Sequence, residues 1–277
     1  MDRVLSTSEL VEKYGLMAKK TLGQNFLLDG NITDKIVRLS LAEQGLNDFS
    51  GEDVAEIGPG PGGLTQAVLR KSPRHLTAIE ADERCVTLLG EIQAYYPQLK
   101  IIHGDALQFD WAAEAENSGK FHIVSNLPYN ISVVLLTGWL KQVQNFKSMT
   151  LMFQKEVADR IMAGCGNKDY GRVSVLAQLQ CEVVRLFELP PTCFVPAPKI
   201  WSSVLLFKPR ENPVEGAVLE RVEKLTGLAF GQRRKMLRQS LKSVSGITDK
   251  AALLGIDLTQ RAENLSPQQY LALAEVF

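Results

Sequence analysis

The stretch Asp53–Leu69, DVAEIGPGPGGLTQAVL, decides the fold class. Residues 53–57 have the pattern of a strand. Residues 58–63 comprise four glycines and two prolines, which predicts a tight turn. Residues 64–69 then have the apolar spacing of a helix that packs on a sheet. A strand, a glycine-rich turn and a helix in this order predict an α/β fold with a largely parallel sheet.

Outward from this stretch, strand and helix patterns continue to alternate. The further strands that we expect are 76–79, 99–102, 121–124, 149–153, 183–186 and 203–207. Asp82 is a suitable N-cap for a helix with apolar residues at 86, 88, 89 and 92. Four small or polar residues stand at strand ends: Gly58, Glu80, Asp105 and Asn126. Because the carboxyl ends of parallel strands form the ligand crevice of such sheets, these four should line one edge.

The chain has 277 residues, more than most single domains. We expect a Rossmann-like domain at 1–210 and a small α-helical domain at 211–277, with a linker near Pro209–Pro213. The helices expected in the second domain are 218–230, 233–244, 249–254 and 267–276. With 45% hydrophobic and 22% charged residues, the composition is that of a folded protein rather than a disordered one.

Charge and cysteine usage limit the classes of partner. Lysine and arginine number 31 and so do aspartate and glutamate, so a nucleic acid would have to bind a local patch. The four cysteines and three histidines lack the spacing of zinc ligands, and we expect no metal. No apolar run approaches the roughly 20 residues that span a bilayer, and the chain begins without an apolar leader. These features predict a cytoplasmic protein without a membrane partner.

The glycine loop satisfies the dinucleotide pattern Gly58-x-Gly60-x-x-Gly63, and Glu80 follows at the distance of a ribose-binding acid. A tight packing turn without a ligand is the alternative. Pro59 and Pro61 have no N–H group, which makes the loop a poor cradle for a pyrophosphate. S-adenosylmethionine (SAM) has no phosphate. It needs close backbone approach, a carboxylate for its ribose and an acceptor for its adenine amine, which the loop, Glu80 and Asp105 supply.

Glu56, just before the loop, is a further candidate. Its carboxylate is expected either to accept hydrogen bonds from backbone amides or to be a solvated charge at a strand end.

Asn126–Tyr129, NLPY, follows the fourth strand and suits chemistry on an adenine amine. That amine is a poor nucleophile, because its lone pair is delocalised into the ring. The Asn126 amide oxygen and the carbonyl of Leu127 or Pro128 can accept its N–H groups and stabilise the positive charge that develops on nitrogen. Tyr129 offers a ring for stacking. The alternative is a turn with a half-buried tyrosine.

A proline-rich loop, Phe194–Lys199, separates the last two expected strands. Phe194 is expected either to cover the opposite face of a flipped base or to be a core residue beneath the loop. Lys199 is expected to reach a phosphate.

Five motifs together resemble the rRNA adenine dimethyltransferase family. They are Gly23–Leu27 (GQNFL), Glu56–Gly60 (EIGPG), Gly104–Ala106 (GDA), Asn126–Asn130 (NLPYN) and Phe194–Lys199 (FVPAPK). The resemblance implies a Rossmann-like class I SAM-dependent methyltransferase fold with a small C-terminal α-helical domain. It also implies N6,N6-dimethylation of two adjacent adenosines near the 3′ end of 16S rRNA, within a pre-30S particle, during small-subunit biogenesis. We expect a monomer.

By motif position, the resemblance implies which residues form the site. The residues that would contact the cofactor are Asn25, Leu27, Gly58, Glu80, Asp105 and Asn126. The residues that would hold the target amine are Asn126, Leu127, Pro128 and Tyr129, with Phe194 beside them.

The family also includes macrolide-resistance methyltransferases that act on large-subunit (23S) rRNA and mitochondrial relatives recruited to transcription. Residues 25–27 and the basic segment 230–237 favour the small-subunit branch. The NLPY form, unlike the proline-proline form of DNA adenine methyltransferases, argues against DNA. Two alternatives stay open: a 23S rRNA methyltransferase, and an assembly or transcription factor in which methylation is incidental.

A basic segment, residues 224–242, contains no acidic residue. Its six basic residues are Lys224, Arg233, Arg234, Lys235, Arg238 and Lys242. If the expected helix 233–244 forms, Arg234, Arg238 and Lys242 share one side of it. A solvated helix face is the alternative, but the lack of balancing acids favours RNA phosphates as the partner. Lys19 and Lys20 are expected to add to the basic surface.

Overall fold

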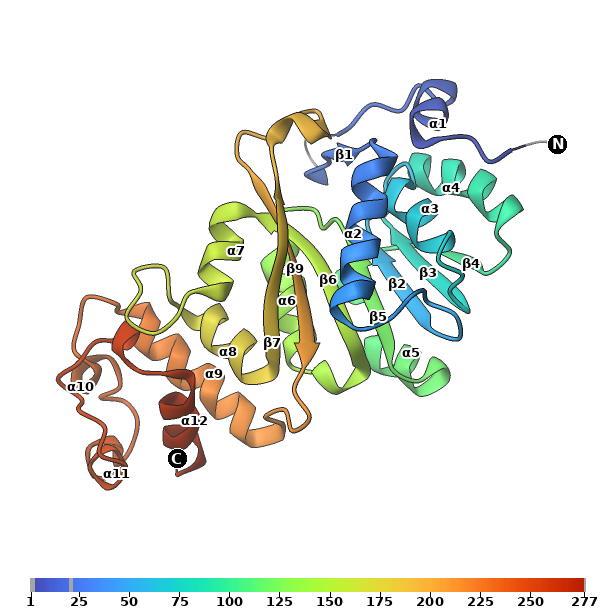
Figure 1. The fold of residues 1–277 in the computed structure, drawn as a ribbon. Coiled ribbons are helices and arrows are strands. Elements are labelled where there is room, and N and C mark those ends of the chain that lie inside the picture. Colours follow the sequence, from blue (N-terminus) through green and yellow to red (C-terminus); the bar gives the residue numbers. More distant parts are fainter. Residues whose placement is uncertain (1–2, 20–21, 277) are drawn as a thin grey trace. The chain divides into compact units, whose positions relative to one another are not determined.

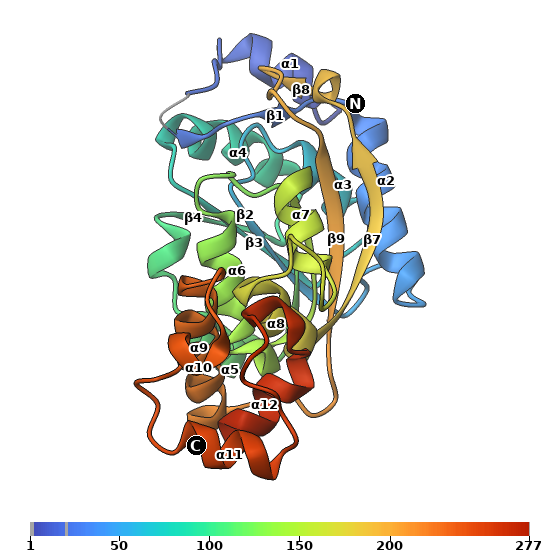
Figure 2. The same ribbon diagram turned by 90° about the vertical axis from the view of Figure 1, so that its left-hand side faces the viewer.

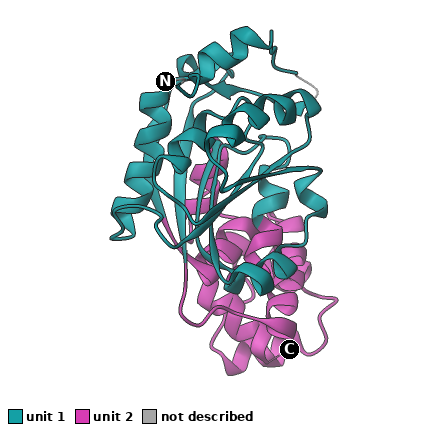
Figure 3. Ribbon diagram, turned by 90° about the vertical axis from the view of Figure 1, so that its right-hand side faces the viewer, with its two compact units in different colours: residues 1–136, 144–155, 184–208 teal, residues 137–143, 156–183, 209–277 magenta. Residues whose placement is uncertain are grey.

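The structure, a computed structural model, describes residues 3–19 and 22–276, so that Lys20 lies outside the described residues. The chain forms two compact units (Figure 3). The first comprises residues 1–136, 144–155 and 184–208, and the second comprises residues 137–143, 156–183 and 209–277. The last boundary falls close to the division that the sequence predicts. The second unit differs from that prediction because it also includes two helical stretches that precede the last strands in sequence.

The first unit is built on a seven-stranded sheet with the order β4-β3-β2-β5-β6-β9-β7 (Figure 1). The strands are β2 (Asp53–Ile57), β3 (His75–Glu80), β4 (Leu99–His103), β5 (Phe121–Ser125), β6 (Phe146–Gln154), β7 (Cys181–Leu189) and β9 (Ser202–Pro209). Strands β2 to β6 pair in parallel, and β9 is antiparallel to β6. All seven strands expected from the sequence are present, so that prediction is confirmed.

Strand β2 lies between β3 and β5, and all five of its residues are buried. The strand order therefore reverses beside its carboxyl end. Such a reversal separates the loops that leave neighbouring strands and opens a crevice for ligands in parallel sheets. The glycine loop leaves β2 at this point and continues into α3 (Gly63–Leu69).

Helices pack on the sheet through the apolar faces that the sequence predicts. Helix α4 (Glu83–Tyr95) begins after Asp82, whose carboxylate accepts a hydrogen bond from the backbone N–H of Arg84, so the predicted N-cap is confirmed. Cys85 is fully buried on this helix, whereas Val86 is only half-buried. The remaining helices and turns that lie wholly in the first unit are α1 (Thr7–Lys13), α2 (Gly30–Glu43), η2 (Ala106–Gln108), α5 (Trp111–Ser118) and η4 (Pro191–Cys193).

A second, two-stranded sheet joins β1 (Phe26–Leu27) to β8 (Phe194–Val195). Phe26 is opposite Val195 and Leu27 is opposite Phe194. Figure 2 shows β1 and β8 side by side. This sheet fixes the N-terminal GQNFL motif next to the proline-rich loop, although the two are far apart in sequence.

The second unit is helical. Its helices are α8 (Arg172–Gln180), α9 (Gly216–Gly231), α10 (Leu237–Ser240), α11 (Ile247–Leu253), η5 (Ala262–Asn264) and α12 (Pro267–Glu275). Elements α6 (Ser132–Leu140), η3 (Val143–Asn145) and α7 (Lys155–Met162) contain residues of both units. Among the described residues, no helix is long and apolar enough to cross a membrane.

The expected helix 233–244 is wrong. After α9, residues 232–235 form a turn, and Met236 pairs with Arg261 in an isolated β-bridge. Only the four residues of α10 are helical. Leu237, Leu241 and Val244 are buried at the spacing of a helix, but only Leu237 belongs to α10, and the other two lie in the turns that follow it.

Candidate active site

A cavity of about 340 Å³ lies in the first unit at the carboxyl ends of the central strands. Four groups of residues line it: 22–27, 56–64 without 62, 79–81 with 104–107, and 126–131. Gly58, Glu80, Asp105 and Asn126 are all among them, so their predicted position along one edge is confirmed. Asn25 and Leu27 also line the cavity.

Close packing of the glycine loop depends on missing side chains. A Cβ atom at Gly63 would lie 2.7 Å from the carbonyl oxygen of Leu27, which is closer than any real contact. Gly58 has a φ of +63°, and a Cβ atom there would lie 3.3 Å from the ring of Pro128. The loop thus lies directly against the GQNFL and NLPY motifs on its two sides.

The backbone amides of this loop are already used. The N–H of Gly58 donates to the carbonyl of Ile79 (2.9 Å), and that of Gly62 donates to the carbonyl of Pro59 (3.0 Å). The N–H of Gly60 donates to the carboxylate of Glu80 (3.0 Å). Residues 59 and 61 are prolines and have no N–H. From 58 to 62, the loop has no amide that could bind a pyrophosphate, which fits a cofactor without phosphate.

Two backbone amides orient the carboxylate of Glu80, which is 5% exposed. Its Oε2 accepts from Gly60 N–H, and its Oε1 accepts from Asp82 N–H (2.8 Å). Burial raises the pKa of Glu80, and these two hydrogen bonds act against that rise. A carboxylate can accept about four hydrogen bonds, so Glu80 can still accept one from a ribose hydroxyl.

Asp105 lies two residues after the end of β4 and caps the short turn η2, where its Oδ1 accepts from Leu107 N–H (2.9 Å). Its side chain is exposed at the cavity. The remaining acceptor positions of this carboxylate suit an exocyclic amine.

The NLPY motif forms the opposite wall. The Nδ2 group of Asn126 donates to the carbonyl of Asn25 (3.3 Å), which turns the amide so that its Oδ1 is the atom available for a ligand. The carbonyl of Pro128 accepts from Ile131 N–H (3.1 Å) in a turn. Of the two carbonyls that the sequence left open as acceptors, the geometry therefore favours that of Leu127.

A hydrogen bond of 2.6 Å between the Tyr129 hydroxyl and Ser202 Oγ fixes the tyrosine ring, which lines the cavity. Burial raises the pKa of Tyr129, so its phenol is neutral at physiological pH. The ring can thus serve for stacking but not as a base.

Phe194 is 2% exposed and does not line the cavity. It packs in the hydrophobic core of the first unit, on the strand pair β1–β8. Of the two positions that the sequence left open for Phe194, the structure has the one in the core. Stacking by Phe194 on a base stays a prediction and would require the loop to move.

Glu56 is buried, with 1% of its surface exposed, so the expectation of a solvated charge is wrong. Its partner is also a side chain rather than a backbone amide, because Thr65 Oγ1 donates to its Oε2 (2.7 Å). Burial, with a contribution from the nearby carboxylate of Glu80, raises the pKa of Glu56 to about 8. Glu56 is therefore largely protonated at neutral pH.

We expect Glu56→Gln to stabilise the protein increasingly as pH rises from 5 to 8. The folded state keeps the Glu56 proton up to about pH 8, whereas the unfolded chain releases it near the ordinary value of 4.5. The wild type therefore loses stability over this range, by at most about 1.4 kcal/mol per pH unit, and glutamine has no proton to release. The Tm of both proteins should be measured at each pH. Glu12→Gln, at an exposed position, is the control, and a Tm difference that shrinks with pH would contradict the assignment.

Comparison with known proteins decides the family. A sequence profile described as "Ribosomal RNA adenine dimethylase" matches residues 15–277. The chain belongs to the ribosomal RNA adenine dimethylase family. The resemblance carried by the five motifs is therefore confirmed.

Three relatives of this family member are named "Ribosomal RNA small subunit methyltransferase A". That of Chelativorans sp. (strain BNC1) is 49% identical and covers 99% of this chain and 98% of its own. That of Mesorhizobium japonicum is 47% identical, with coverages of 96% and 95%. That of Rhodospirillum rubrum is 46% identical, with coverages of 96% and 90%.

Two solved structures have the same fold. A dimethyladenosine transferase from Plasmodium falciparum matches with a TM-score of 0.70 and 24% identity, covering 88% of this chain and 94% of its own. The 23S rRNA methyltransferase ErmE matches with a TM-score of 0.66 and 25% identity, covering 91% and 98%. The Rossmann-like fold of class I SAM-dependent methyltransferases, expected from the sequence, is thus confirmed.

The basic residues of this family member differ in their surroundings. Lys199 is exposed in the loop before β9, and Arg234, Lys235 and Arg238 are exposed in the second unit. Arg233 differs, because its guanidinium donates to the carbonyls of Lys168 (2.7 Å) and Tyr170 (2.9 Å) and its Cζ lies 5.8 Å from the centre of the Phe230 ring. Arg233 therefore fixes the turn that carries Arg234 and Lys235, whereas Arg238 follows in α10.

Sequence reasoning gave no role in the site to three polar residues around the cavity. Gln24 lines it and lies within the GQNFL motif, which was the available indication. Ser202 holds Tyr129, and Asp82 contacts Glu80 and Gln24. Neither of these contacts follows from a sequence pattern.

Proposed function

We propose that the protein dimethylates the N6 amines of two adjacent adenosines near the 3′ end of 16S rRNA, with SAM as the methyl donor. The observation that carries this proposal is that one cavity is lined by the glycine loop, by Glu80 and Asp105 and by the NLPY motif. The backbone N–H groups of the loop from 58 to 62 are all absent or already used. The relatives of 46–49% identity, named for the small subunit, support the choice of rRNA. The similarity to ErmE is weaker, at 25% identity. It supports a shared fold but not the large-subunit substrate of the alternative function.

The residues of the cavity fit SAM. Glu80, held by two amides, is placed to accept from ribose hydroxyls, and Asp105 is placed to accept from the adenine amine. The crowded backbone at Gly58 and the N-terminal wall from Asn25 to Leu27 enclose the rest. When bound, SAM supplies an electrophilic methyl group on a sulfonium centre.

The NLPY motif would hold the target amine. Asn126 Oδ1 and the Leu127 carbonyl accept from the two N–H groups of the amine, and they stabilise the positive charge that develops on N6. The Tyr129 ring supports the base, and its hydroxyl is fixed by Ser202. No residue of the described cavity wall has to act as a strong base, because N6 becomes acidic once it carries the new bond and can lose its proton to water.

The finer parts of the proposal concern the partner. We propose that the substrate is 16S rRNA in a pre-30S particle and that the protein acts in the cytoplasm as a monomer. We also propose that residues 211–277, as part of the second unit, bind RNA. The run of basic residues without acids between 224 and 242 supports RNA phosphates as the partner of this segment.

The test is incubation of the purified protein with labelled SAM and with small or large ribosomal subunits that lack the modification. The methylated nucleosides are then mapped by mass spectrometry. Dimethyladenosine confined to two neighbouring positions of 16S rRNA is the expected result. Label in 23S rRNA would select the resistance-type alternative, and cofactor binding without transfer would favour an assembly factor.

We expect the triple variant Arg234→Ala, Lys235→Ala, Arg238→Ala to bind RNA more weakly and with less salt dependence. Three phosphate contacts account for about 2–3 units of the slope of log K against log salt. Arg233 stays unchanged, because its contacts with Lys168 and Tyr170 hold the turn. The affinity for a 16S fragment should be measured at several salt concentrations from about 50 to about 200 mM.

The matched control removes three positive charges from exposed positions of the first unit, namely Arg38, Lys100 and Lys120. An equal slope in the triple variant and the wild type would place the phosphate contacts elsewhere.

A further inference from the structure

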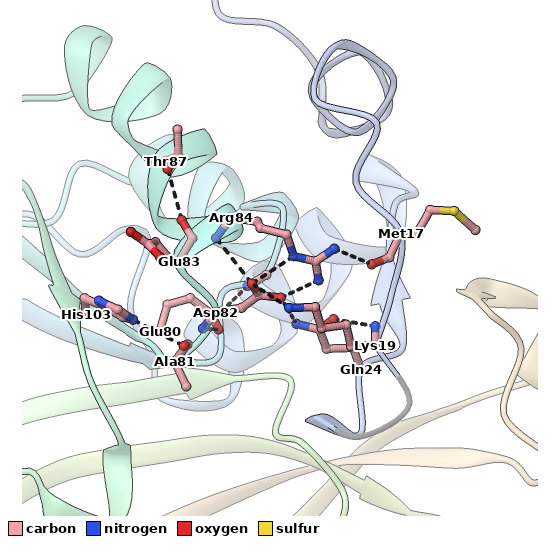
Figure 4. A network of polar contacts seen from close by, with 11 residues as sticks. Met17, Lys19, Gln24, Glu80, Ala81, Asp82, Glu83, Arg84, Thr87 and His103 are labelled. Carbon is pink, nitrogen blue, oxygen red and sulfur yellow. Dashed lines mark hydrogen bonds and ion pairs between the residues drawn. The ribbon is translucent and has the colours of Figure 1, made fainter.

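Asp82 makes more contacts than a helix cap requires. It lies between the end of β3 at Glu80 and the start of α4 at Glu83, and it is 4% exposed. Arg84 donates to it from Nε (3.0 Å to Oδ1) and from Nη2 (2.5 Å to Oδ2). Gln24 Nε2 donates to Oδ2 (3.1 Å), and Lys19 Nζ lies 3.8 Å from Oδ1 (Figure 4).

The same group of residues holds the N-terminal stretch at two further points. Arg84 Nη1 donates to the carbonyl of Met17 (3.1 Å), and the N–H of Lys19 donates to Gln24 Oε1 (2.8 Å). Figure 4 shows these residues converging on Asp82 from the N-terminal stretch and from the start of α4. The pair Asp82–Arg84 therefore binds Met17, Lys19 and Gln24, which stand at the two ends of residues 17–24.

These contacts continue into the cavity. Gln24 lines it, and the next residue is Asn25, whose carbonyl accepts from Asn126. On the other side, the N–H of Asp82 donates to Oε1 of Glu80. Asp82 thus lies between the N-terminal wall of the cavity and the carboxylate proposed to accept from the ribose.

A simple helix cap does not explain this arrangement. Asp110 caps α5 through one hydrogen bond from Ala113 N–H, and its side chain is exposed. Asp82 caps α4 in the same way, but it is buried and also binds residues about 60 positions earlier in the chain. Burial of an aspartate is costly unless several donors surround it, and here the donors come from the stretch that closes the cavity.

We propose that Asp82 is a positioning residue for the cofactor: it holds residues 22–25 against Glu80 as one wall of the cavity, and SAM affinity depends on that link. The proposal rests on SAM as the cofactor. Asp82 acts through Gln24 and Glu80, and it does not itself line the cavity.

The test uses two single variants and their combination. Asp82→Asn keeps an oxygen for the N-cap but loses the charge that binds Arg84 and Lys19. Gln24→Ala removes the link from the opposite side and leaves the cap and the Arg84 pair intact. Each single variant should raise the Kd for SAM about tenfold. The Kd of the double variant should be close to that of either single variant, because both substitutions break the same link. KM for SAM should rise with Kd, while kcat at saturating SAM stays within about twofold.

A second readout needs no cofactor. In the free protein, amide hydrogen exchange of the described residues 17–19 and 22–25 should be faster in both variants than in the wild type, with the exchange of β2 unchanged. Asp53→Asn is the matched control. Asp53 is also a buried aspartate that pairs with an arginine, Arg74, but it lies outside the cavity wall, so neither SAM affinity nor this exchange should change.

Unchanged Kd and unchanged exchange in folded Asp82→Asn would overturn the proposal. If that variant does not fold, Gln24→Ala decides alone, because it leaves the buried aspartate paired. Additive losses in the double variant would also overturn it, since the two residues would then act separately. Failure of the wild type itself to bind SAM would instead refute the proposed function.

Discussion

Asn126→Ala is expected to lower kcat for methyl transfer by about 100-fold or more. Removing one preorganised polar partner of a developing charge typically costs 10²–10³ in rate. The Asn126 amide is preorganised, because its Nδ2 donates to the Asn25 carbonyl and its Oδ1 is left for the amine. Glu80 and Asp105 remain in the variant, so SAM should still bind within about fivefold of the wild type.

Single-turnover rates with 16S rRNA and calorimetric titration with SAM separate these two effects. Asn117→Ala, which removes an exposed asparagine from α5, is the control. Turnover of Asn126→Ala at the wild-type rate would rule out its oxygen as the acceptor. Equal losses in SAM affinity and rate would show that its main task is to bind the cofactor.

The second large effect is expected for Glu80→Gln, which should weaken SAM binding by about 10- to 100-fold. The carboxylate accepts from Gly60 N–H on one oxygen and from Asp82 N–H on the other. A glutamine has one oxygen, so its NH₂ group must face one of these donors, and a buried N–H loses its partner. The charge that a ribose hydroxyl would contact is lost as well.

With saturating SAM, kcat of Glu80→Gln should fall only a few-fold, because the target amine is held by other residues. Glu83→Gln, an exposed neighbour at the start of α4, is the control. A normal Kd combined with a low kcat would assign Glu80 to the chemical step rather than to the cofactor.

The sheet could be predicted from the sequence because each of its strands is a local apolar run between turn residues. The four strand-end residues could be placed for the same reason, since the topology of a parallel sheet brings its carboxyl ends together. The prediction of a helix at 233–244 was wrong because the buried apolar residues have the spacing of an amphipathic helix, although most of this segment forms turns.

The parts of the site that could not be predicted depend on contacts between distant residues. Whether Glu56 is solvated or buried is decided by Thr65 and by the packing around β2. Whether Phe194 is a core residue or is exposed for stacking is decided by its strand pairing with Leu27. The contact of Asp82 with Gln24 has no local sequence pattern. An aspartate before a helix looks the same in the sequence whether it only caps the helix or also binds a distant segment.

The pairing of β1 with β8 also bears on the order in which the protein folds. Phe26 and Leu27 line one wall of the cavity, yet their strand partners are Val195 and Phe194, which a ribosome synthesises much later. Closing so long a loop costs chain entropy that only the preformed sheet between them can offset. The cofactor pocket should therefore be among the last parts to form. A nascent chain that ends before β8 would already have its parallel strands but could not yet retain SAM.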